Sequence, residues 1–553
     1  MKILHKMKVL ITVSKMFNLT KGFVLLLVIG PLCGCEDVLE ELPETEVSGV
    51  VLVKDETTAR EVVNGVYDPI GWGESSFRVT SHAYEFWFGD TATDDAEKGS
   101  TSGDQPGVTF LKDFTSNGGN ANIGALWAKH WVVISRANEA LELLTGPEAT
   151  ISEELNLELQ GEAHFLRAYS YSTLVKIFGP VPLFQEPLNQ DLITERNFTK
   201  AKLGDVYTLI DSDLRFAIEN LPLKGVRELG RANKGSAAAY LARSILYQLG
   251  TVNAQSYTWQ DLLDVTDSFI AQEYGSYGLE PNYALIHEVD HENGIESIFE
   301  VQAIAGSDWR QRGPYTGSQW TLTQSPQFMG GWGFNIPNQN LVDAYTSNDP
   351  RRPSVALAIG EYAYGVQMEE SVRNNTGYYP RKEIMDPAIW SGGDDKASPG
   401  NIMKFRYADI LLMNAEAAYH ESQFAQARER LIEIRARASA STFPIGFDPS
   451  TPDQTSATGF APLLESDIPA SGQPLLNFIY DERRRELAME QLRFWDLVRT
   501  GRYISVMDNL YQTGANIEAH TLADDEVYVN PVPVFPIPSQ DAIGWGIEQN
   551  RGY

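Results

Sequence analysis

Three tryptophans and a tyrosine between residues 309 and 332 are the side chains best suited to bind a ligand: Trp309, Tyr315, Trp320 and Trp332. Glutamine, serine and other polar residues separate them, so flat aromatic faces alternate with amide and hydroxyl groups. A neutral sugar needs this combination, because its C–H face stacks on a ring while its hydroxyls hydrogen-bond to amides and carboxylates. The spacing predicts a stacking platform, although the same rings could instead fill a small core of their own region.

Residues His287 to His291 spell the H-E-x-x-H pattern of zinc proteases. That chemistry requires both histidines on one face of a stable helix, with a third ligand beyond it. Here Asn293-Gly294 ends any helix within a turn, and a strand-like run begins at Ser297. We therefore expect no zinc catalysis at this segment, and we assign neither a metal site nor a cofactor to the chain.

Glu482, Glu486 and Glu490 are spaced to line one helix face, which could suggest the paired carboxyl groups of a glycosidase. Arginines surround them at positions 483–485 and 493. Nearby guanidinium groups lower the pKa of a carboxyl, whereas a general acid must hold its proton at neutral pH. We interpret the cluster as an ion-pair network that fixes the C-terminal helix. The chain also lacks a P-loop, a nucleophile elbow and a Cys-His pair, so no catalytic residue is predicted.

The composition is that of a folded, acidic protein. Of its 553 residues, 43% are apolar and 11% are aromatic, which is ample material for a large core. The formal net charge is −30 at pH 7. This sign repels nucleic acid and anionic lipid head groups, so no nucleic-acid partner is expected, and a polyanionic ligand is disfavoured unless a local basic pocket overrules the average.

The first 34 residues have the layout of a bacterial lipoprotein signal peptide. Lys15 and Lys21 precede the apolar run Phe23–Ile29, which is too short to span a bilayer, since a span takes about 20 residues. Leu32-Cys33-Gly34-Cys35 resembles the lipobox read by lipoprotein signal peptidase, which implies cleavage before Cys35 and lipidation of its thiol. We predict a signal peptide at 1–34 and a lipidated acidic tether at 35–50; an uncleaved anchor or a buried N-terminal helix is the alternative.

Helical periodicity dominates the chain from about residue 54 onward. The pattern predicts helices over 152–178, 204–221, 233–249, 258–273, 403–420, 424–439 and 475–501. Small residues alternate with aromatics in consecutive helices, as around Ala415–Tyr419 and Phe424–Ile434, so that two helices can approach closely while a ring fills the crossing. We predict a mainly α fold, in which degenerate tetratricopeptide-like helical hairpins form a scaffold.

The composition changes between about residues 275 and 402, where Gly, Ser, Asn, Gln, Pro and aromatics prevail around short strand-like runs such as 297–301. Loops of this length in a compact protein are more often functional than accidental. We therefore expect a single body at 51–553, in which helical repeats at about 51–273 and 403–501 frame a loop-rich ligand-binding region at about 275–402.

An ordered set of short motifs runs through the chain: Gly161–Ala168, Phe178–Leu183, Arg231–Ala238, Glu296–Glu300, Leu341–Tyr345, Asp349–Arg351, Ala408–Glu416, Asp481–Leu487, Arg493–Arg499, Phe535–Pro538 and Gln549–Tyr553. Each motif is weak alone. Taken in order, they resemble the SusD/RagB family of outer-membrane lipoproteins of Bacteroidetes over nearly the whole mature chain. One departure lies at 544–546, where the family's usual Asn-Pro before the terminal Gln-Asn is replaced.

The resemblance implies a lipid-anchored protein on the outward face of the outer membrane, with a SusC-like TonB-dependent transporter as its partner. It implies non-catalytic binding of an oligosaccharide or polysaccharide and delivery of that glycan to the transporter for nutrient uptake. Some family members take peptides instead, so a RagB-like peptide binder is one alternative function, and an exported hydrolase is another.

The resemblance also suggests a second candidate site, because family members place ligand contacts in the loops before the helix that here contains Trp127. The candidates are Trp87, Asp90, Asp94 and Asp95. The alternative for this segment is a solvated acidic loop without a ligand.

Overall fold

The computed structural model describes residues 53–71, 84–187, 198–252, 257–304, 319–347, 349–390, 392, 398–461, 465–524 and 527–553. The predicted signal peptide, the tether and Cys35 lie outside these residues. Lys54–Tyr553 forms one compact unit. Its described part is mainly helical with a few short strands, which confirms the predicted fold class. No helix among the described residues is both long enough and apolar enough to cross a bilayer.

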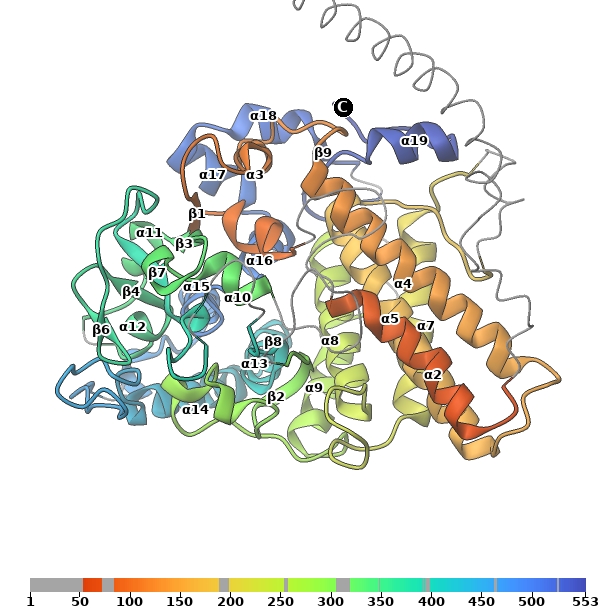
Figure 1. Cartoon of the computed structure of the whole chain (residues 1–553), viewed down its shortest axis with the longest axis horizontal. Helices are drawn as coiled ribbons and strands as arrows, with labels where there is room; N and C mark the ends of the chain where they lie inside the picture. The colour runs from red at the N-terminus through yellow and green to blue at the C-terminus, as the bar shows by residue number, and fades with distance from the viewer. Residues whose placement is uncertain are drawn as a thin grey trace, which may run out of the picture. The chain divides into compact units, whose positions relative to one another are not determined.

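A series of long helices forms the scaffold, and each helix packs against the next one in the series (Figure 1). The series is α4 (Ala121–Thr145), α5 (Glu153–Phe178), α7 (Leu203–Asn220), α8 (Lys234–Thr251), α9 (Trp259–Ile270), α13 (Tyr407–His420) and α14 (Phe424–Ala440). The helix α2 (Glu56–Tyr67) packs on α4 and α5. The hairpin predicted around Ala415–Ile434 therefore exists, as α13 with α14, and α8 with α9 is a second helical pair.

Local capping explains why these helices begin where the sequence predicts. Ser152 accepts a hydrogen bond from the Leu155 amide at 3.3 Å, at the start of α5. Asn233 and Thr258 each form a reciprocal capping box at the starts of α8 and α9. Gly179 ends α5 with a φ of 68°, a backbone conformation that glycine adopts without steric cost.

The prediction of one helix over 403–420 is wrong at its start. Residues Ile402–Arg406 form the strand β8, which pairs antiparallel with β2 (Ser297–Val301), and the helix α13 begins only at Tyr407. Pairing with β2 satisfies the backbone groups of this segment, and such tertiary contacts override a local helical pattern. The strand predicted at 297–301 is confirmed.

The predicted helix over 475–501 is interrupted. The structure has α15 (Gly472–Glu486) and α16 (Arg493–Arg499), joined by a turn in which Met489 and Gln491 have φ values of 60° and 64°. The turn packs tightly on another segment, since a Cβ added to Gly89 would lie 2.3 Å from the Gln491 carbonyl oxygen. The Gln491 amide also donates to the Asp90 carboxylate at 2.9 Å. These long-range contacts fix a turn that the local sequence does not predict.

The remaining elements are short. The other strands form two-stranded antiparallel pairs: β1 (Ala96–Gly99) with β3 (Phe334–Pro337), β4 (Ala356–Ala358) with β7 (Tyr378–Pro380), β5 (Tyr362–Ala363) with β6 (Val366–Gln367), and β9 (Thr521–Leu522) with β10 (Val532–Pro533). The other helices and turns are η1 (Asp68–Gly71), η2 (Trp87–Thr91), α3 (Pro106–Lys112), η3 (Tyr283–Leu285), η4 (Val289–His291), α10 (Gln319–Gln324), η5 (Gln327–Met329), α11 (Gln339–Val342), α12 (Arg351–Val355), η6 (Arg381–Glu383), η7 (Glu465–Asp467), α17 (Tyr503–Tyr511), α18 (Gly514–Ala519) and α19 (Ser539–Trp545).

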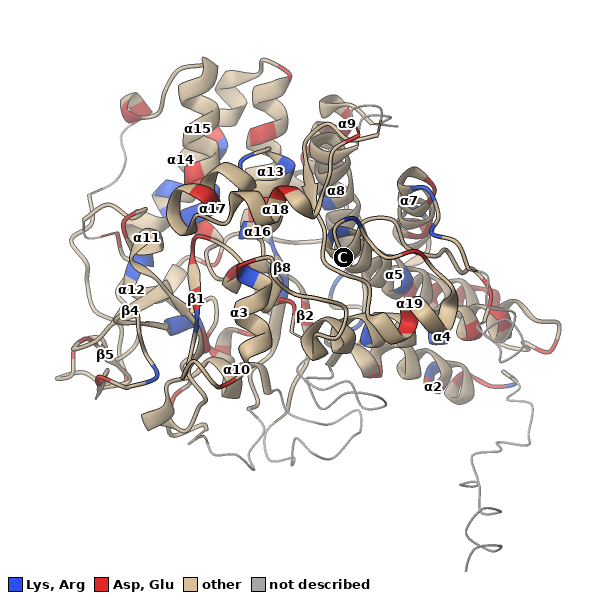
Figure 2. Ribbon diagram, turned by 90° about the horizontal axis from the view of Figure 1, so that it is seen from above, with Lys and Arg blue, Asp and Glu red and all other residues tan. Residues whose placement is uncertain are grey.

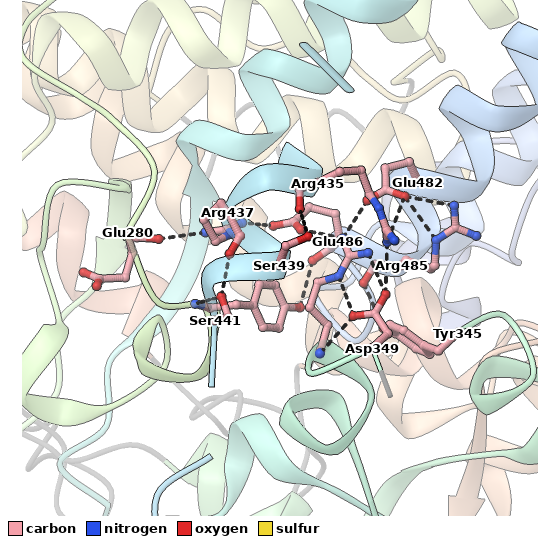
Figure 3. Close-up of polar contacts among 12 residues, drawn as sticks. Glu280, Tyr345, Asp349, Arg435, Arg437, Ser439, Ser441, Glu482, Arg485 and Glu486 are labelled. Carbon is pink, nitrogen blue, oxygen red and sulfur yellow. Dashed lines mark hydrogen bonds and ion pairs between the residues drawn. The ribbon is translucent and has the colours of Figure 1, made fainter. Parts of the chain in front are cut away.

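A buried ion-pair network surrounds α15 and confirms the interpretation of its glutamates (Figure 3). Arg351 has no exposed surface and contacts Asp349 at 2.9 Å, Glu482 at 2.7 Å and Glu486 at 3.0 Å. Arg437 also pairs with Glu486. Basic and acidic groups thus alternate through the interior, and α15 lies at their centre.

Arg406 extends the network from α15 to the strand β8. Its guanidinium lies 2.6 Å from Glu296, 2.8 Å from Glu486 and 2.8 Å from Glu490. Burial by itself raises the pKa of Glu486, but the guanidinium groups of Arg437, Arg406 and Arg351 lower it to about 2. Glu490 lies in the turn after α15 and not on the helix, so the three glutamates share a network but do not share one helix face.

Replacement of Arg406 by alanine is expected to lower the free energy of unfolding by about 3–5 kcal/mol, because it leaves three buried carboxylates without their shared partner. A matched control is Arg428→Ala, which removes a guanidinium 3.5 Å from the largely exposed carboxylate of Glu465 and should cost less than about 1 kcal/mol. Urea denaturation of both variants measures the difference, and equal losses would contradict the role assigned to the network.

Candidate functional site

The structure places two of the four predicted platform residues, while Trp309 and Tyr315 lie outside the described residues. Trp320 lies on α10 and is only 6% exposed, with its indole N–H donating to Glu383 at 2.8 Å. Its ring packs edge-on against Phe86, with 4.7 Å between the ring centroids. Trp332 is half-buried and packs against a small apolar cluster that includes Met385. Both tryptophans therefore also serve the packing of their own region.

The second candidate set lies in the interior. Trp87, Asp90, Asp94 and Asp95 are all 2% exposed or less, so the alternative of a solvated acidic loop is wrong for this segment. Asp94 accepts two hydrogen bonds of 2.8 Å from Arg493. Burial raises the pKa of Asp94, but the Arg493 and Arg484 guanidinium groups lower it to about 2.

Asp95 pairs with Arg484 at 2.5 Å, and Asp90 accepts from the Gln491 amide. Trp87 packs edge-on against Phe334, with 5.6 Å between the ring centroids. In this structure the four side chains are occupied by contacts within the protein. Their assignment to a ligand stays a prediction.

A pocket that is open to solvent lies beside Trp320. Segments far apart in the sequence build it: the turn around η4, the end of β2, the start of α10, the residues that follow η6, the start of β8, and the turn between α15 and α16. The wall contains Trp320, Tyr364 and several aliphatic side chains, together with an unusual number of carboxyl groups. The acidic members of the lining are Glu288, Glu292, Glu300, Glu383, Asp386 and Glu490.

Two of these carboxyl groups are desolvated and make no ion pair with any residue that the structure describes. Burial raises the pKa of Glu383 to about 7, against the opposing hydrogen bonds from Trp320 and Thr321. Burial likewise raises the pKa of Glu292 to about 7, although the Asn401 amide donates to it at 2.7 Å. A carboxyl near its pKa can both accept and donate hydrogen bonds, as sugar hydroxyls require.

Two other carboxylates are neutralised within the wall. Glu288 pairs with Arg381 at 2.7 Å and accepts from the Tyr364 hydroxyl at 2.5 Å. Glu490 pairs with Lys382 and with Arg406. These contacts hold Tyr364 and Lys382 in place at the pocket wall.

The histidines of the H-E-x-x-H segment do not form a zinc site. His287 precedes the short turn η4 and His291 is its last residue; His287 lies 3.6 Å from Glu490, whereas His291 lies 3.4 Å from Glu280. Burial lowers the pKa of His287 to about 4, so its imidazole is neutral at pH 7. Across the part of the chain that the structure describes, no three His, Cys, Asp or Glu side chains are grouped to hold a metal ion.

The apolar side of the pocket is partly exposed. Ile389 is 45% exposed, and Met385 joins the pocket lining to the cluster that contains Trp332. Asn401 bridges the acidic side, because its side-chain amide donates to Glu300 at 2.9 Å. The lining thus combines hydrogen-bond acceptors with apolar surface, which suits a ligand with both hydroxyl and C–H faces.

Sequence reasoning identified Trp320 in this pocket but missed its acidic wall. Glu292, Glu300, Glu383 and Asp386 have no motif spacing, and the chain brings them together only through long-range folding. The one local signal was their position within the loop-rich region at about 275–402, where loops tend to carry function.

Residues 360–553 match the family model described as the SusD family, and residues 40–246 match the model described as starch-binding associating with outer membrane. The chain is 27% identical over 521 residues to SusD-like protein P38 of Formosa agariphila, and the match covers 89% of this chain and 93% of that protein.

Solved structures show the same fold. A laminarin binding SusD-like protein is 27% identical and has a TM-score of 0.68, with 90% of this chain and all of that chain covered. Surface glycan-binding protein A from Bacteroides thetaiotaomicron in complex with laminarihexaose is 20% identical, with a TM-score of 0.70 and the same coverage. The second likeness concerns the fold alone.

Replacement of Glu383 by glutamine is expected to change how stability depends on pH. Because burial raises the pKa of Glu383 to about 7 in the folded state, and its ordinary pKa of 4.5 applies in the unfolded state, the native protein loses stability as pH rises between these values. The glutamine variant lacks that loss, so its stability relative to the native protein should rise from pH 4.5 to pH 7 and then level off.

Thermal unfolding at a series of pH values measures this difference. Glu142→Gln on the exposed surface of α4 is the control and should show no such trend. A stability difference for Glu383→Gln that is constant from pH 4.5 to pH 8 would contradict the raised pKa.

Proposed function

Because this chain belongs to the SusD/RagB family, we propose that it binds an oligosaccharide or polysaccharide at the cell surface and delivers it to a SusC-like TonB-dependent transporter for nutrient uptake. The observation that carries the proposal is the pocket beside Trp320, whose wall combines hydrogen-bond acceptors with apolar and aromatic surface. These are the two chemical features that a sugar ring presents to a protein.

The stacking residues that we propose are Trp320 and Trp332, together with Trp309 and Tyr315 from the same predicted platform. The half-buried ring of Trp332 packs with Met385, a residue of the pocket wall. Trp320 itself lines the pocket and is held by its hydrogen bond to Glu383. A ring fixed in this way loses little entropy when a ligand binds, which favours affinity.

The protein is a non-catalytic binder, like the SusD-like proteins that it resembles. The raised pKa values of Glu383 and Glu292 are therefore assigned to ligand binding and not to acid catalysis. A β-glucan of the laminarin type is the first ligand to test, because a laminarin binding protein is among the structures similar to this chain.

Peptide binding is the second candidate, and the acidic pocket wall is the observation that favours it, since carboxylates could receive lysine or arginine side chains of a peptide. The same titration decides between the two ligand classes when a peptide mixture is included beside the glycans.

Isothermal titration of a soluble form that begins after Cys35 should detect micromolar to millimolar binding of one neutral glycan class. Trp309→Ala, Trp320→Ala and Trp332→Ala should each be measured, and at least one should weaken binding fivefold or more, because stacking on an aromatic ring contributes more than about 1 kcal/mol at a binding hot spot.

Trp259→Ala is the matched control, because this half-buried ring lies at the start of α9 and stacks on His420 instead of lining the pocket. Circular dichroism confirms that each variant is folded. If none of the three tryptophan substitutions weakens glycan binding, the proposed stacking platform is wrong. If the protein binds peptides and no glycan, the proposed glycan binding is wrong.

We also propose that Cys35 carries the lipid that anchors the protein to the outer membrane, facing outward beside its transporter. Cys35→Ala should abolish incorporation of radiolabelled palmitate and release the protein from the outer-membrane fraction, since stable anchoring needs the acyl chains. Affinity purification of the native, lipidated protein should recover a TonB-dependent transporter. Undiminished palmitate labelling of the Cys35→Ala variant would contradict the anchor assignment.

A further inference from the structure

The charges of the pocket wall are unbalanced. Among the residues that the structure describes, six carboxyl groups line the pocket, against one ammonium group, that of Lys382. The neighbouring His287 does not offset them, because burial keeps its imidazole neutral at pH 7. A ligand that enters the pocket therefore meets a surplus of negative charge.

Part of this negative charge is cancelled inside the protein. Glu490 pairs with Lys382 and Arg406, and Glu288 pairs with Arg381. These two carboxylates and their partners form closed ion pairs in the wall. They contribute little net field to the pocket, because opposite charges at contact distance largely cancel.

Four carboxyl groups remain, and none of them makes an ion pair with a described residue: Glu292, Glu300, Glu383 and Asp386. Their hydrogen-bond donors are uncharged, such as the Asn401 amides for Glu292 and Glu300 and the Trp320 indole for Glu383. Lys224 also interacts with Glu300, which raises the pKa of the lysine against the larger effect of burial, and its ammonium donates to the backbone carbonyls of Gly294 and Ser297. The described part of the pocket therefore keeps more carboxyl groups than cations, although the pKa values of about 7 leave Glu292 and Glu383 only partly ionised at pH 7.

We propose that this pocket selects glycans by charge: it accepts sugar units that are neutral or carry an ammonium group, and it excludes units that carry a carboxylate or a sulfate. The inference rests on the proposed function and names the ligand class for the same site. Neutral hydroxyls donate to the four carboxyl groups. An ammonium adds a charge-assisted hydrogen bond, whereas an anionic substituent meets like charge in a partly desolvated space.

The test compares three ligands that share one backbone: laminarihexaose, the same hexamer oxidised to carboxylates at C6, and the same hexamer aminated at C6. Isothermal titration at pH 7 should show the carboxylate form binding at least tenfold more weakly than the neutral form, and the amine form binding at least threefold more tightly. The titrations should be repeated at low and at high salt. High salt should reduce the affinity differences of both charged hexamers from the neutral one, because salt screens the charges.

The double variant Glu292→Gln with Glu383→Gln reduces the wall charge while it keeps the acceptors for the Asn401 amide and the Trp320 indole. It should bring the affinities of the three ligands closer together, and circular dichroism confirms that the variant is folded. Glu142→Gln on α4 makes the same chemical change at an exposed position outside the pocket and should leave the ratios unchanged.

Equal affinity for the neutral and carboxylate forms, or tighter binding of the carboxylate form, would overturn the charge selection while leaving the proposed glycan binding intact. Unchanged ratios in the double variant would overturn the assignment to these two glutamates. Failure of all three hexamers and of the wider glycan panel would instead overturn the proposed function, and the charge selection with it.

Discussion

The interior of this protein is organised by the need to neutralise buried charge. Arg351 and Arg406 have almost no exposed surface, and an unpaired guanidinium in that position would cost several kcal/mol. Each must therefore meet carboxylates from several segments at once. Arg406 reaches Glu296 ahead of β2, Glu486 on α15 and Glu490 beyond it, so one side chain fixes three parts of the chain relative to the strand β8.

This constraint positions the pocket. Glu490 belongs to the network through Arg406 and belongs to the pocket wall through Lys382. The turn that carries Glu490 is held from its other side by Asp90 and by the close approach of Gly89 to Gln491. The positions of lysine, arginine, aspartate and glutamate along the ribbon are spread through both the helical and the irregular parts of the body, as Figure 2 shows, and the ion-pair network connects these parts at the turn. A rigid wall follows, against which a ligand can be oriented without ordering a loop.

The local sequence pattern was enough to predict the helices, because the small residues, aromatic residues and capping residues that specify each helix, such as Ser152 and Asn233, lie close to it in the sequence. It failed where distant partners decide the conformation. Residues 402–406 became a strand because β2 pairs with them, and the left-handed residues Met489 and Gln491 interrupt a helical pattern because Gly89 and Asp90 contact the turn. For the same reason the sequence pointed to Trp320 but not to the acidic wall, whose members come from separate segments.

The contrast between two kinds of buried carboxylate argues that the pocket wall is functional. Around α15 the carboxylates of Glu482 and Glu486 each contact guanidinium groups, and Glu486 ionises readily, with a pKa of about 2. In the pocket, Glu383 and Glu292 have no such partner among the described residues, and burial raises their pKa values to about 7. Buried carboxyl groups without a cationic partner represent a stability cost beside this open cavity. Such costs are typical of sites at which polar side chains bind a ligand and do not pair with other side chains of the protein.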